Sequence, residues 1–391
     1  MNTLLYRYGS ICENDIIDAF NEYGIAVYEE TAEIYNKLLT SSERVDLLGK
    51  RLLERDYAFV FSINYFPDIS SVCQIVGIPY LCLIVDSPVL ELYSNTISNS
   101  CNRIFLFDSD LYNEFYPYNP DGIFYMPLAS NVKRWDEVIG NSTLDFHADV
   151  SFVGSLYTEK CGYDKLIFTS PYTKGYVEGI IEAQLKIYGY FFVEEMLSDA
   201  MTEEILNAAK DIYRFPEGYR CNDRALLAQL YIGTKITVEE RQRLFDRLSK
   251  KFDIDIYTGS DLSKLSRLNG RGFAKTLTEM PLIFNQSIIN LNPTAKSIRA
   301  GIPLRIFDIL GCGGFLISNY QKDLPMFFDI NEHLVTYDSL EDLEYKTQYY
   351  LEHPKERMEI ARNGYEYVKN NHTYVIRLGQ IIAKAFEDKK E

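Results

Sequence analysis

Alternating apolar and polar stretches along the chain predict strands and helices in turn. In the first part, apolar runs typical of buried strands lie at residues 4–8, 25–29, 57–63, 79–85, 103–107 and 122–126. Helical periodicity is found at 14–23 and 69–76, and a glycine follows each stretch. Short strands that alternate with helices predict βαβ units and a parallel sheet.

A polar stretch at 131–149 interrupts this alternation and is interpreted as a linker. Strand-like runs resume at 150–153, 254–257, 287–291, 315–317 and 334–337, and helices are expected at 339–369 and 373–387. Residues 160–250 have a mostly helical pattern and are too long for an ordinary crossover, so they predict an insertion. We expect an α/β fold of two Rossmann-like domains, 1–148 and 149–370, with the insertion in the second. Such domains place their ligand in a cleft between them, at the carboxyl ends of the strands.

Composition narrows the class of protein. The chain has 391 residues, 47% hydrophobic and 25% charged, which suits a globular protein of two or three domains. The net charge of −16 argues against a nucleic-acid partner, because phosphate backbones require a basic surface. The 31 tyrosines and 23 phenylalanines suit sugar recognition, although biased amino-acid usage explains them more simply.

The sequence predicts a cytoplasmic protein without a transmembrane segment. Its first residues do not combine a basic region with a long apolar one, and no apolar run approaches the ~20 residues that span a bilayer. The seven cysteines are scattered, and neither they nor the four histidines have metal-ligand spacing. We expect buried, reduced cysteines and no metal site.

The richest motif lies between Asn290 and Phe327. A strand ends at Asn292, and the loop after it carries Lys296 and Arg299. Basic side chains before a helix N-terminus suit a diphosphate, because both the charges and the free amides attract anions.

The helix that follows this loop places Arg305 and Asp308 on one face, since three residues separate them. A carboxylate in that position can accept both hydroxyls of a ribose. Gly313 and Gly314 end the helix. The alternative is an ordinary helix C-cap with an Arg–Asp surface pair.

Several segments of the sequence resemble a known family. Gly301–Ser318 looks like the nucleotide-binding signature of group 1 glycosyltransferases of the GT-B fold, nearest to the spore-maturation CgeB-like subgroup. The amino-terminal domain of that subgroup is similar to four further segments: Tyr8–Ile17, Phe61–Pro67, Val85–Pro88 and Phe105–Tyr112. His372–Arg377 resembles its closing motif. Matches in this order, over nearly the whole chain except the insertion, are more specific than any single one.

The resemblance implies a GT-B enzyme with a nucleotide-sugar donor in the C-terminal half. It makes Asp308 the ribose-binding carboxylate and places Gly313, Gly314 and Phe315 beside the nucleotide. The candidates around the diphosphate, sugar and base are Gly154, Ser155, Tyr257, Gly259, Asn292, Lys296, Arg299 and Arg305. UDP-sugar is the expected donor, no further cofactor is required, and the acceptor is a protein or glycan.

The resemblance also places the acceptor on the N-terminal half, with Gly9, Asn14 and Tyr65 on the acceptor side. The C-terminal helix at 371–391 is expected to cross back to this domain. The insertion shapes either an acceptor surface or a subunit contact, which leaves a homo-oligomer open.

One departure from the family bears on the reaction. Many retaining members carry a Glu eight positions before the ribose carboxylate, where this chain has Ala300, so a retaining mechanism is not carried over. Asp308 itself stands where Glu is common and has a shorter reach.

Glycosyl transfer builds negative charge on the departing diphosphate, which Lys and Arg side chains stabilise when no metal does. An inverting enzyme also needs a base. Glu13, Asp15 and Asp86 are candidates, because each follows a predicted strand end. The alternatives are a helix N-terminal carboxylate for Asp15 and a capped turn before Pro88 for Asp86.

Two other functions share this architecture. One is an epimerase acting on a nucleotide diphosphate sugar, and the other is a non-catalytic carbohydrate- or partner-binding protein on a degenerate GT-B fold. Asp108-Ser109-Asp110 spells the metal-binding motif of a different glycosyltransferase fold, but we interpret Asp108 as a turn residue at a strand end or a helix cap.

Overall fold

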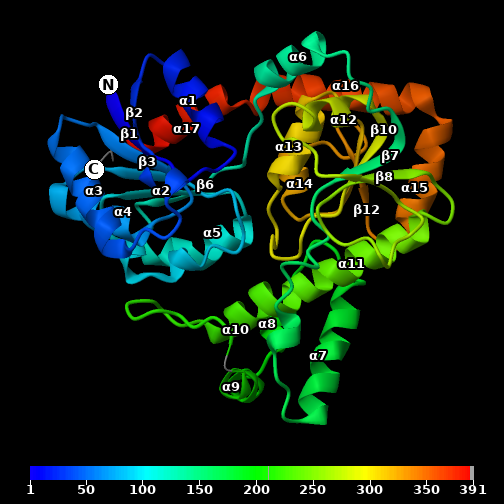
Figure 1. Ribbon diagram of the computed structural model, residues 1–391, viewed down its shortest axis with the longest axis horizontal. Helices are drawn as coiled ribbons and strands as arrows, with labels where there is room; N and C mark the ends of the chain where they lie inside the picture. Colours follow the sequence, from blue (N-terminus) through cyan, green and yellow to red (C-terminus); the bar gives the residue numbers. More distant parts are fainter. Residues whose placement is uncertain (210, 388–391) are drawn as a thin grey trace. The chain divides into compact units, whose positions relative to one another are not determined.

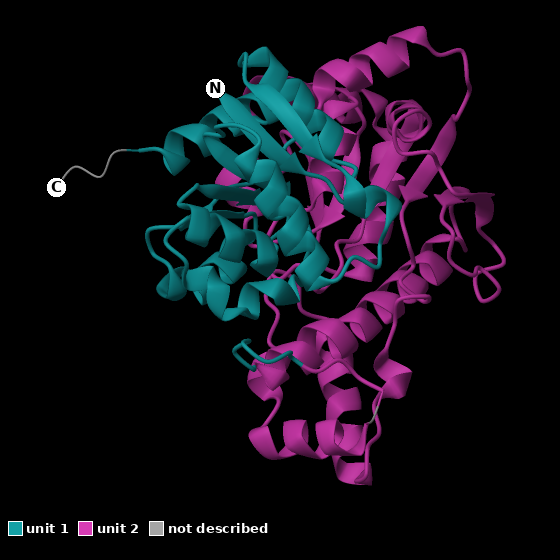
Figure 2. Ribbon diagram, turned by 60° about the vertical axis from the view of Figure 1, so that its left-hand side comes forward, with its two compact units in different colours: residues 1–129, 215–221, 372–391 teal, residues 130–214, 222–371 magenta. Residues whose placement is uncertain are grey.

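The structure, a computed structural model, describes residues 1–209 and 211–387. It divides into two units, which Figure 2 colours separately. Unit 1 comprises residues 1–129, 215–221 and 372–391, and unit 2 comprises residues 130–214 and 222–371. Residue 210 of the predicted insertion and residues 388–391 of the predicted C-terminal segment lie outside the described residues.

Unit 1 contains a six-stranded parallel sheet in the order β2-β1-β3-β4-β5-β6. Its strands are β1 (Asn2–Tyr6), β2 (Ala26–Glu30), β3 (Phe59–Ile63), β4 (Tyr80–Leu83), β5 (Asn102–Leu106) and β6 (Ile123–Tyr125). Every side chain of β3 is buried, as its continuous apolar run predicts for a central parallel strand.

Helices cover both faces of this sheet (Figure 1). They are α1 (Glu13–Glu22), α2 (Ala32–Tyr35), α3 (Ser41–Leu53), α4 (Pro67–Val76), α5 (Ser109–Phe115) and α17 (Tyr374–Ala385), with short 3-10 turns η1 (Leu90–Tyr93), η2 (Asn95–Ser98) and η3 (Tyr116–Tyr118). The last helix, α17, packs against α1, and Tyr23 donates a hydrogen bond of 3.0 Å to the Val375 carbonyl oxygen. The C-terminal helix therefore belongs to the same unit as the N-terminus.

Unit 2 contains a second six-stranded parallel sheet, in the order β12-β11-β10-β7-β8-β9. Its strands are β7 (Ala148–Val153), β8 (Ile254–Tyr257), β9 (Asn269–Gly272), β10 (Ser287–Asn292), β11 (Leu316–Asn319) and β12 (Val335–Tyr337). The prediction of an α/β fold built on two parallel sheets is confirmed. The hydrophobic pattern did not predict β9, because its sequence, Asn-Gly-Arg-Gly, has no apolar side chain.

The helices around the second sheet are α6 (Val132–Asn141), α11 (Gly233–Leu248), α12 (Met280–Gln286), α13 (Leu304–Gly311), α14 (Leu324–Phe327), α15 (Leu340–Glu352) and α16 (Pro354–Asn371). Figure 1 shows α12 and α13 on one face of the sheet and α11 and α15 on the other. The single helix expected at 339–369 is two helices, because the residue before a proline is driven out of helical geometry and Pro354 begins the second. The polar stretch at 131–149 is not all linker, since α6 buries Val132 and Trp135.

Between β7 and β8 the chain forms the helices of the insertion. These are η4 (Tyr163–Lys165), α7 (Pro171–Gln184), α8 (Val193–Met196), α9 (Asp199–Ala208), α10 (Asp223–Leu226) and a π-helical turn, η5 (Leu227–Ile232), that leads into α11. Within residues 1–209 and 211–387, no helix combines the length and the apolar character needed to cross a bilayer.

Candidate functional site

Helix α13 carries the predicted ribose carboxylate, Asp308. This side chain is only 5% exposed, and Ser130 donates a hydrogen bond of 3.2 Å to its Oδ1. The same Ser130 hydroxyl accepts a bond of 2.9 Å from the indole of Trp135 on α6. The polar stretch before β7 thus helps to orient the carboxylate.

Arg305 lies one turn before Asp308. Its guanidinium contacts the Met280 sulfur at 2.7 Å and lies 5.3 Å from the Phe284 ring centroid. Burial lowers the pKa of Arg305, and the charge of Asp308 opposes this shift. Arg305 forms no salt bridge within the described part of the chain, so its charge is available to an anionic ligand.

The two glycines after α13 end the helix as predicted. Gly313 has φ +74°, a left-handed conformation that favours glycine. A Cβ atom on Gly314 would lie 2.5 Å from the Phe284 carbonyl oxygen, which leaves no room for a side chain. The next residue, Phe315, packs its ring 4.8 Å from that of Tyr350 in the core of unit 2, so this ring is not open to a ligand.

The structure gives Lys296 an internal partner. Its Nζ lies 3.2 Å from Oε1 of Glu240 on α11, and both side chains are buried. The backbone amide of Lys296 donates to the Thr237 hydroxyl at 3.0 Å. Glu240 therefore compensates the charge of Lys296, which the sequence predicted to bind a diphosphate. Arg299 is half-buried on the same loop and stays a candidate for this role.

Asn292 also makes internal hydrogen bonds. It is buried at the end of β10, and its Nδ2 donates to the hydroxyls of Thr294 at 2.9 Å and Ser318 at 3.0 Å. These bonds fix the start of the loop that carries Lys296 and Arg299.

The loops after β7 and β8 lie side by side, because the Gly154 amide donates to the Tyr257 carbonyl oxygen at 3.0 Å. Ser155 donates from its hydroxyl to Glu159 at 2.6 Å, so this hydroxyl is held within its loop. Tyr257 is buried, which raises the pKa of its phenol. A Cβ on Gly259 would meet no atom within 4 Å, so that position is open to a ligand.

Arg241 on α11 joins two of these loops, and it was not among the predicted residues. Its Nη1 donates to the Ser155 carbonyl oxygen and its Nη2 to the Pro293 carbonyl oxygen at 2.6 Å. Burial lowers the pKa of this guanidinium. The sequence held a signal, because Arg241 falls on the apolar face of its helix, with Leu244, Phe245 and Leu248.

In unit 1, Glu13 is fully buried and holds the loop after β1. Its Oε1 accepts the backbone N–H groups of Tyr8, Gly9 and Ser10 at 2.8, 2.9 and 3.0 Å. Its Oε2 accepts from Arg7 Nε at 3.0 Å. With these four bonds in the loop, the strand ends at Tyr6, two residues earlier than the hydrophobic pattern predicts. The bonds favour a structural role for Glu13.

The neighbours of Glu13 include three other predicted residues. Gly9 adopts φ +95° in the loop, and the exposed Asn14 accepts a hydrogen bond of 3.0 Å from Arg7 Nη2. Asp15 is buried in the first turn of α1. This position agrees with the alternative interpretation of Asp15 as a carboxylate at a helix N-terminus.

Unit 1 also contains a pocket of about 940 Å³ at the carboxyl ends of β1, β3 and β4. Asn64, with φ +57°, donates from Nδ2 to the Tyr8 hydroxyl at 2.9 Å and to Asp86 Oδ2 at 2.7 Å. Its Oδ1 accepts from the Val85 amide at 3.0 Å. Asn64 thereby fixes the loop that presents Asp86, and it was not among the predicted residues.

Of the three candidate bases, only Asp86 is exposed, and it lines this pocket. Tyr65 also lines the pocket, but it is 1% exposed and its hydroxyl lies 2.8 Å from that of Thr96. Burial raises the pKa of Tyr65. The hydroxyl of Tyr65 is therefore engaged within the pocket wall, which favours a structural role for this residue over direct contact with a ligand.

Of the two interpretations of Asp108, the structure confirms the helix cap. Its Oδ1 accepts the amides of Asp110 at 2.9 Å and Leu111 at 3.1 Å at the start of α5. Across residues 1–209 and 211–387, no three His, Cys, Asp or Glu side chains are grouped to hold a metal ion.

Comparison with known proteins adds a family-model match over part of the chain and a fold. Residues 240–383, which include α13 and its glycines, match a family model described as "Glycosyl transferase-like". The structure is similar to sucrose-phosphate synthase from Thermosynechococcus elongatus, with a TM-score of 0.57, 11% identity and 99% of each chain covered. The chain has the GT-B fold of glycosyltransferases.

Two further structures support this fold assignment. Anabaena Alr3699/HepE, solved with UDP-glucose, has a TM-score of 0.52, 10% identity and 98% of each chain covered. A glycosyltransferase from Rickettsia africae has a TM-score of 0.51, 11% identity and 99% of each chain covered. No curated protein matches the chain in sequence. How the two GT-B units face each other across a cleft stays a prediction.

Proposed function

We propose that this chain is a glycosyltransferase that moves a sugar from a nucleotide diphosphate sugar to a protein or glycan acceptor without a metal ion. UDP-sugar is the proposed donor, as in the UDP-glucose complex of Anabaena Alr3699/HepE. One observation carries the proposal. Within the matched region, α13 presents a buried carboxylate at Asp308 and, at Arg305, an arginine that forms no salt bridge in the described part of the chain, just before two glycines.

The reaction is written as a displacement. The acceptor hydroxyl oxygen forms a bond to the anomeric carbon, the bond from that carbon to the diphosphate oxygen breaks, and the nucleoside diphosphate leaves with the electron pair. Arg305 and Arg299 are proposed to stabilise the negative charge of the departing diphosphate. The proton of the acceptor hydroxyl passes to a carboxylate, for which we propose Asp86.

The finer assignment to the CgeB-like subgroup is also part of the proposal. Three of the segments that carry the resemblance contribute residues to one pocket: Tyr8 after β1, Asn64–Pro67 after β3, and Asp86 and Pro88 after β4. Segments far apart in the sequence that line one pocket are typical of a binding site. We propose that this pocket binds the acceptor.

A cytoplasmic location completes the proposal. All seven cysteines are free thiols, and four of them, Cys12, Cys73, Cys82 and Cys312, are buried. Such thiols suit a reducing compartment.

The test compares nucleotide binding with donor turnover. UDP and UDP-sugars should raise the melting temperature of the wild-type chain, and Asp308→Asn should remove this effect while circular dichroism shows a folded protein. The matched control is Asp149→Asn, which changes an exposed aspartate on β7 and should respond as the wild type does.

Three outcomes would contradict the proposal. A folded wild-type chain that no nucleotide stabilises would contradict it, and full stabilisation of Asp308→Asn would refute the donor site. A donor converted to its epimer with no acceptor present would replace transfer by epimerisation.

A further inference from the structure

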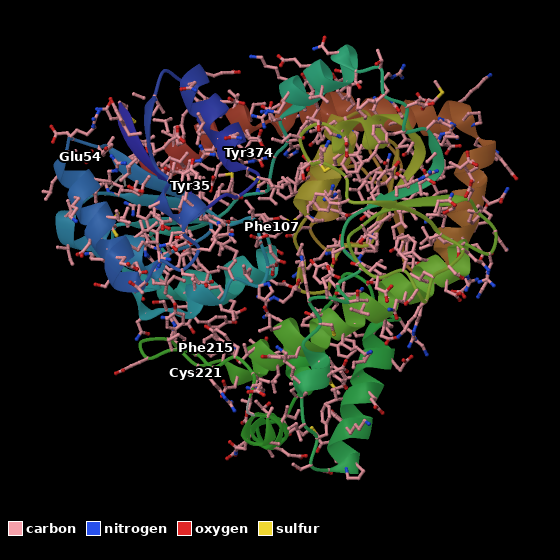
Figure 3. All side chains as sticks on the ribbon, viewed as in Figure 1. Tyr35, Glu54, Phe107, Phe215, Cys221 and Tyr374 are labelled. Atoms are coloured by element: carbon pink, nitrogen blue, oxygen red, sulfur yellow. The ribbon has the colours of Figure 1, made fainter. Side chains whose placement is uncertain are left out.

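A segment of the helical insertion forms one wall of the pocket in unit 1. We name residues 215–221 the strap; Figure 3 labels its two ends, Phe215 and Cys221. Pro216, Glu217, Gly218 and Tyr219 line the pocket. The strap, which belongs to unit 1, therefore shapes the same pocket that the strand ends of this unit form.

Backbone hydrogen bonds hold the strap against the turns η1 and η2. The Asn95 amide donates to the Gly218 carbonyl oxygen at 2.9 Å, and the Arg220 amide donates to the Tyr93 carbonyl oxygen at 2.8 Å. Ser94 and Tyr219 form an antiparallel bridge between these two bonds. The strap is thus fixed as a short two-stranded pairing.

Ring contacts add to this pairing. The Phe215 ring lies 5.2 Å from that of Tyr93, and the Arg220 guanidinium lies 3.7 Å from the Tyr118 ring centroid. Since both ends of the strap are anchored, Glu217 and Gly218 between them hold a defined place in the wall.

The charged groups that line the pocket are predominantly negative. They are Glu33, Asp68, Asp86, Glu91 and Glu217, with Arg44 as the cationic group. Arg44 already forms salt bridges with Glu33 and Asp68. Within the described part of the chain, the carboxylates of Asp86, Glu91 and Glu217 form no salt bridge.

The pocket also offers aromatic surface. The rings of Tyr8 and Phe66 meet edge to face, with centroids 5.5 Å apart, and both line the wall. Its volume of about 940 Å³ lies near the upper end of the ~300–1,000 Å³ of small-molecule sites. Aromatic faces bind both sugar rings and cations.

We propose that the acceptor carries a positive charge beside its reactive hydroxyl, as an amino sugar with a free ammonium group does, and that Glu217 on the strap selects it. This inference rests on the proposed function. An anionic acceptor would meet three carboxylates without cationic partners and an arginine whose charge is already balanced. A cationic acceptor would be attracted to the same groups.

The test measures binding and transfer with three sugars of similar size and different charge. These are glucosamine, glucose and glucuronate. For binding, each is titrated into the full chain with UDP bound. For transfer, each is offered as acceptor together with the UDP-sugar donor, and the release of UDP is followed. We expect the dissociation constant to rise by at least about threefold from glucosamine to glucose and again to glucuronate. Since this preference is electrostatic, it should shrink as salt is raised.

Variants of the strap connect this preference to Glu217. Glu217→Gln should reduce the preference for glucosamine over glucuronate, and Glu217→Lys should abolish or reverse it. Glu203→Gln is the matched control, because Glu203 is exposed on α9 of the same insertion and does not line the pocket.

The outcomes separate this inference from the proposed function. If UDP does not bind and no donor is turned over, the proposed function fails. If UDP binds but glucosamine does not bind detectably, or the three sugars bind equally, or Glu217→Lys keeps the wild-type preference, only this inference is overturned.

Discussion

Arg241 Nη2 donates a hydrogen bond of 2.6 Å to the carbonyl oxygen of Pro293, while its Nη1 donates to the carbonyl oxygen of Ser155. One buried guanidinium thus links the loop after β7 to the loop after β10. Both loops carry residues proposed to surround the donor, although Arg241 belongs to a helix that the donor motif does not include.

We predict that Arg241→Lys destabilises the chain by about 2–3 kcal/mol and raises the KM for the donor more than it lowers kcat. A lysine reaches one carbonyl but not both, and hydrogen bonds to charged groups contribute about 1.5–3 kcal/mol each. Urea unfolding and steady-state kinetics measure the two effects. Arg243→Lys is the control on the same helix, because Arg243 pairs with Glu182 at the surface, where such pairs contribute little. Equal effects of both variants would contradict a positioning role.

We predict that Asp86→Asn lowers the rate of transfer at least about 100-fold while UDP still binds, since an amide cannot take up the acceptor proton. Glu13→Gln should behave differently. It replaces a carboxylate oxygen that accepts three backbone N–H groups, so its main effect should be a lower melting temperature. A Glu13→Gln protein that stays as stable as the wild type but loses transfer would move the base from Asp86 to Glu13.

We predict that Gly314→Ala destabilises unit 2 by about 1–3 kcal/mol, as forced insertions into packed sites do. The new methyl group would lie 2.5 Å from the Phe284 carbonyl oxygen on α12 and 2.8 Å from Asn290 Nδ2 on β10, and these two atoms are hydrogen-bonded to each other. Gly140→Ala is the matched control, because a Cβ there meets nothing within 4 Å and the residue is helical. Alanine at that position should stabilise the chain by about 0.5–1 kcal/mol. Melting temperatures that shift in opposite directions for the two variants would agree with this prediction, and equal shifts would contradict it.

We predict that stability falls as the pH rises above about 9. Burial raises the pKa of the Cys82 and Cys312 thiols and of the Tyr80 and Tyr337 phenols well above their ordinary values. In the unfolded chain these groups lose their protons near their ordinary pKa values, about 8.5 for cysteine and 10 for tyrosine. The folded state keeps them protonated, so unfolding releases protons, and the stability present below pH 8.5 is lost as the pH rises. Urea midpoints between pH 8 and 10.5 measure this, and a flat profile would contradict it.

The sequence predicted most of the secondary structure and the α/β class, because parallel strands buried on both faces leave continuous apolar runs. Where a strand contains no apolar run, as in β9, the pattern gave no signal. The start of α16 shows the converse, since a proline divides what the periodicity presents as one helix.

Local sequence also predicted the chemistry that depends on nearby residues. The end of α13 at Gly313 and Gly314, the helix cap at Asp108 and the shared face of Arg305 and Asp308 each involve positions a few residues apart. Backbone conformation and helical spacing are sufficient to determine such features.

Tertiary structure decided which charges stay available to a ligand. Glu240 pairs with Lys296 from 56 positions away, four hydrogen bonds enclose Glu13, and Asn64 supports an exposed Asp86. The sequence left open whether the insertion shapes an acceptor surface or a subunit contact, and only the structure identifies the strap as part of the pocket wall in unit 1. The physical reason is that a charge is compensated by whatever lies within a few ångströms in space, and a sequence specifies only the neighbours along the chain.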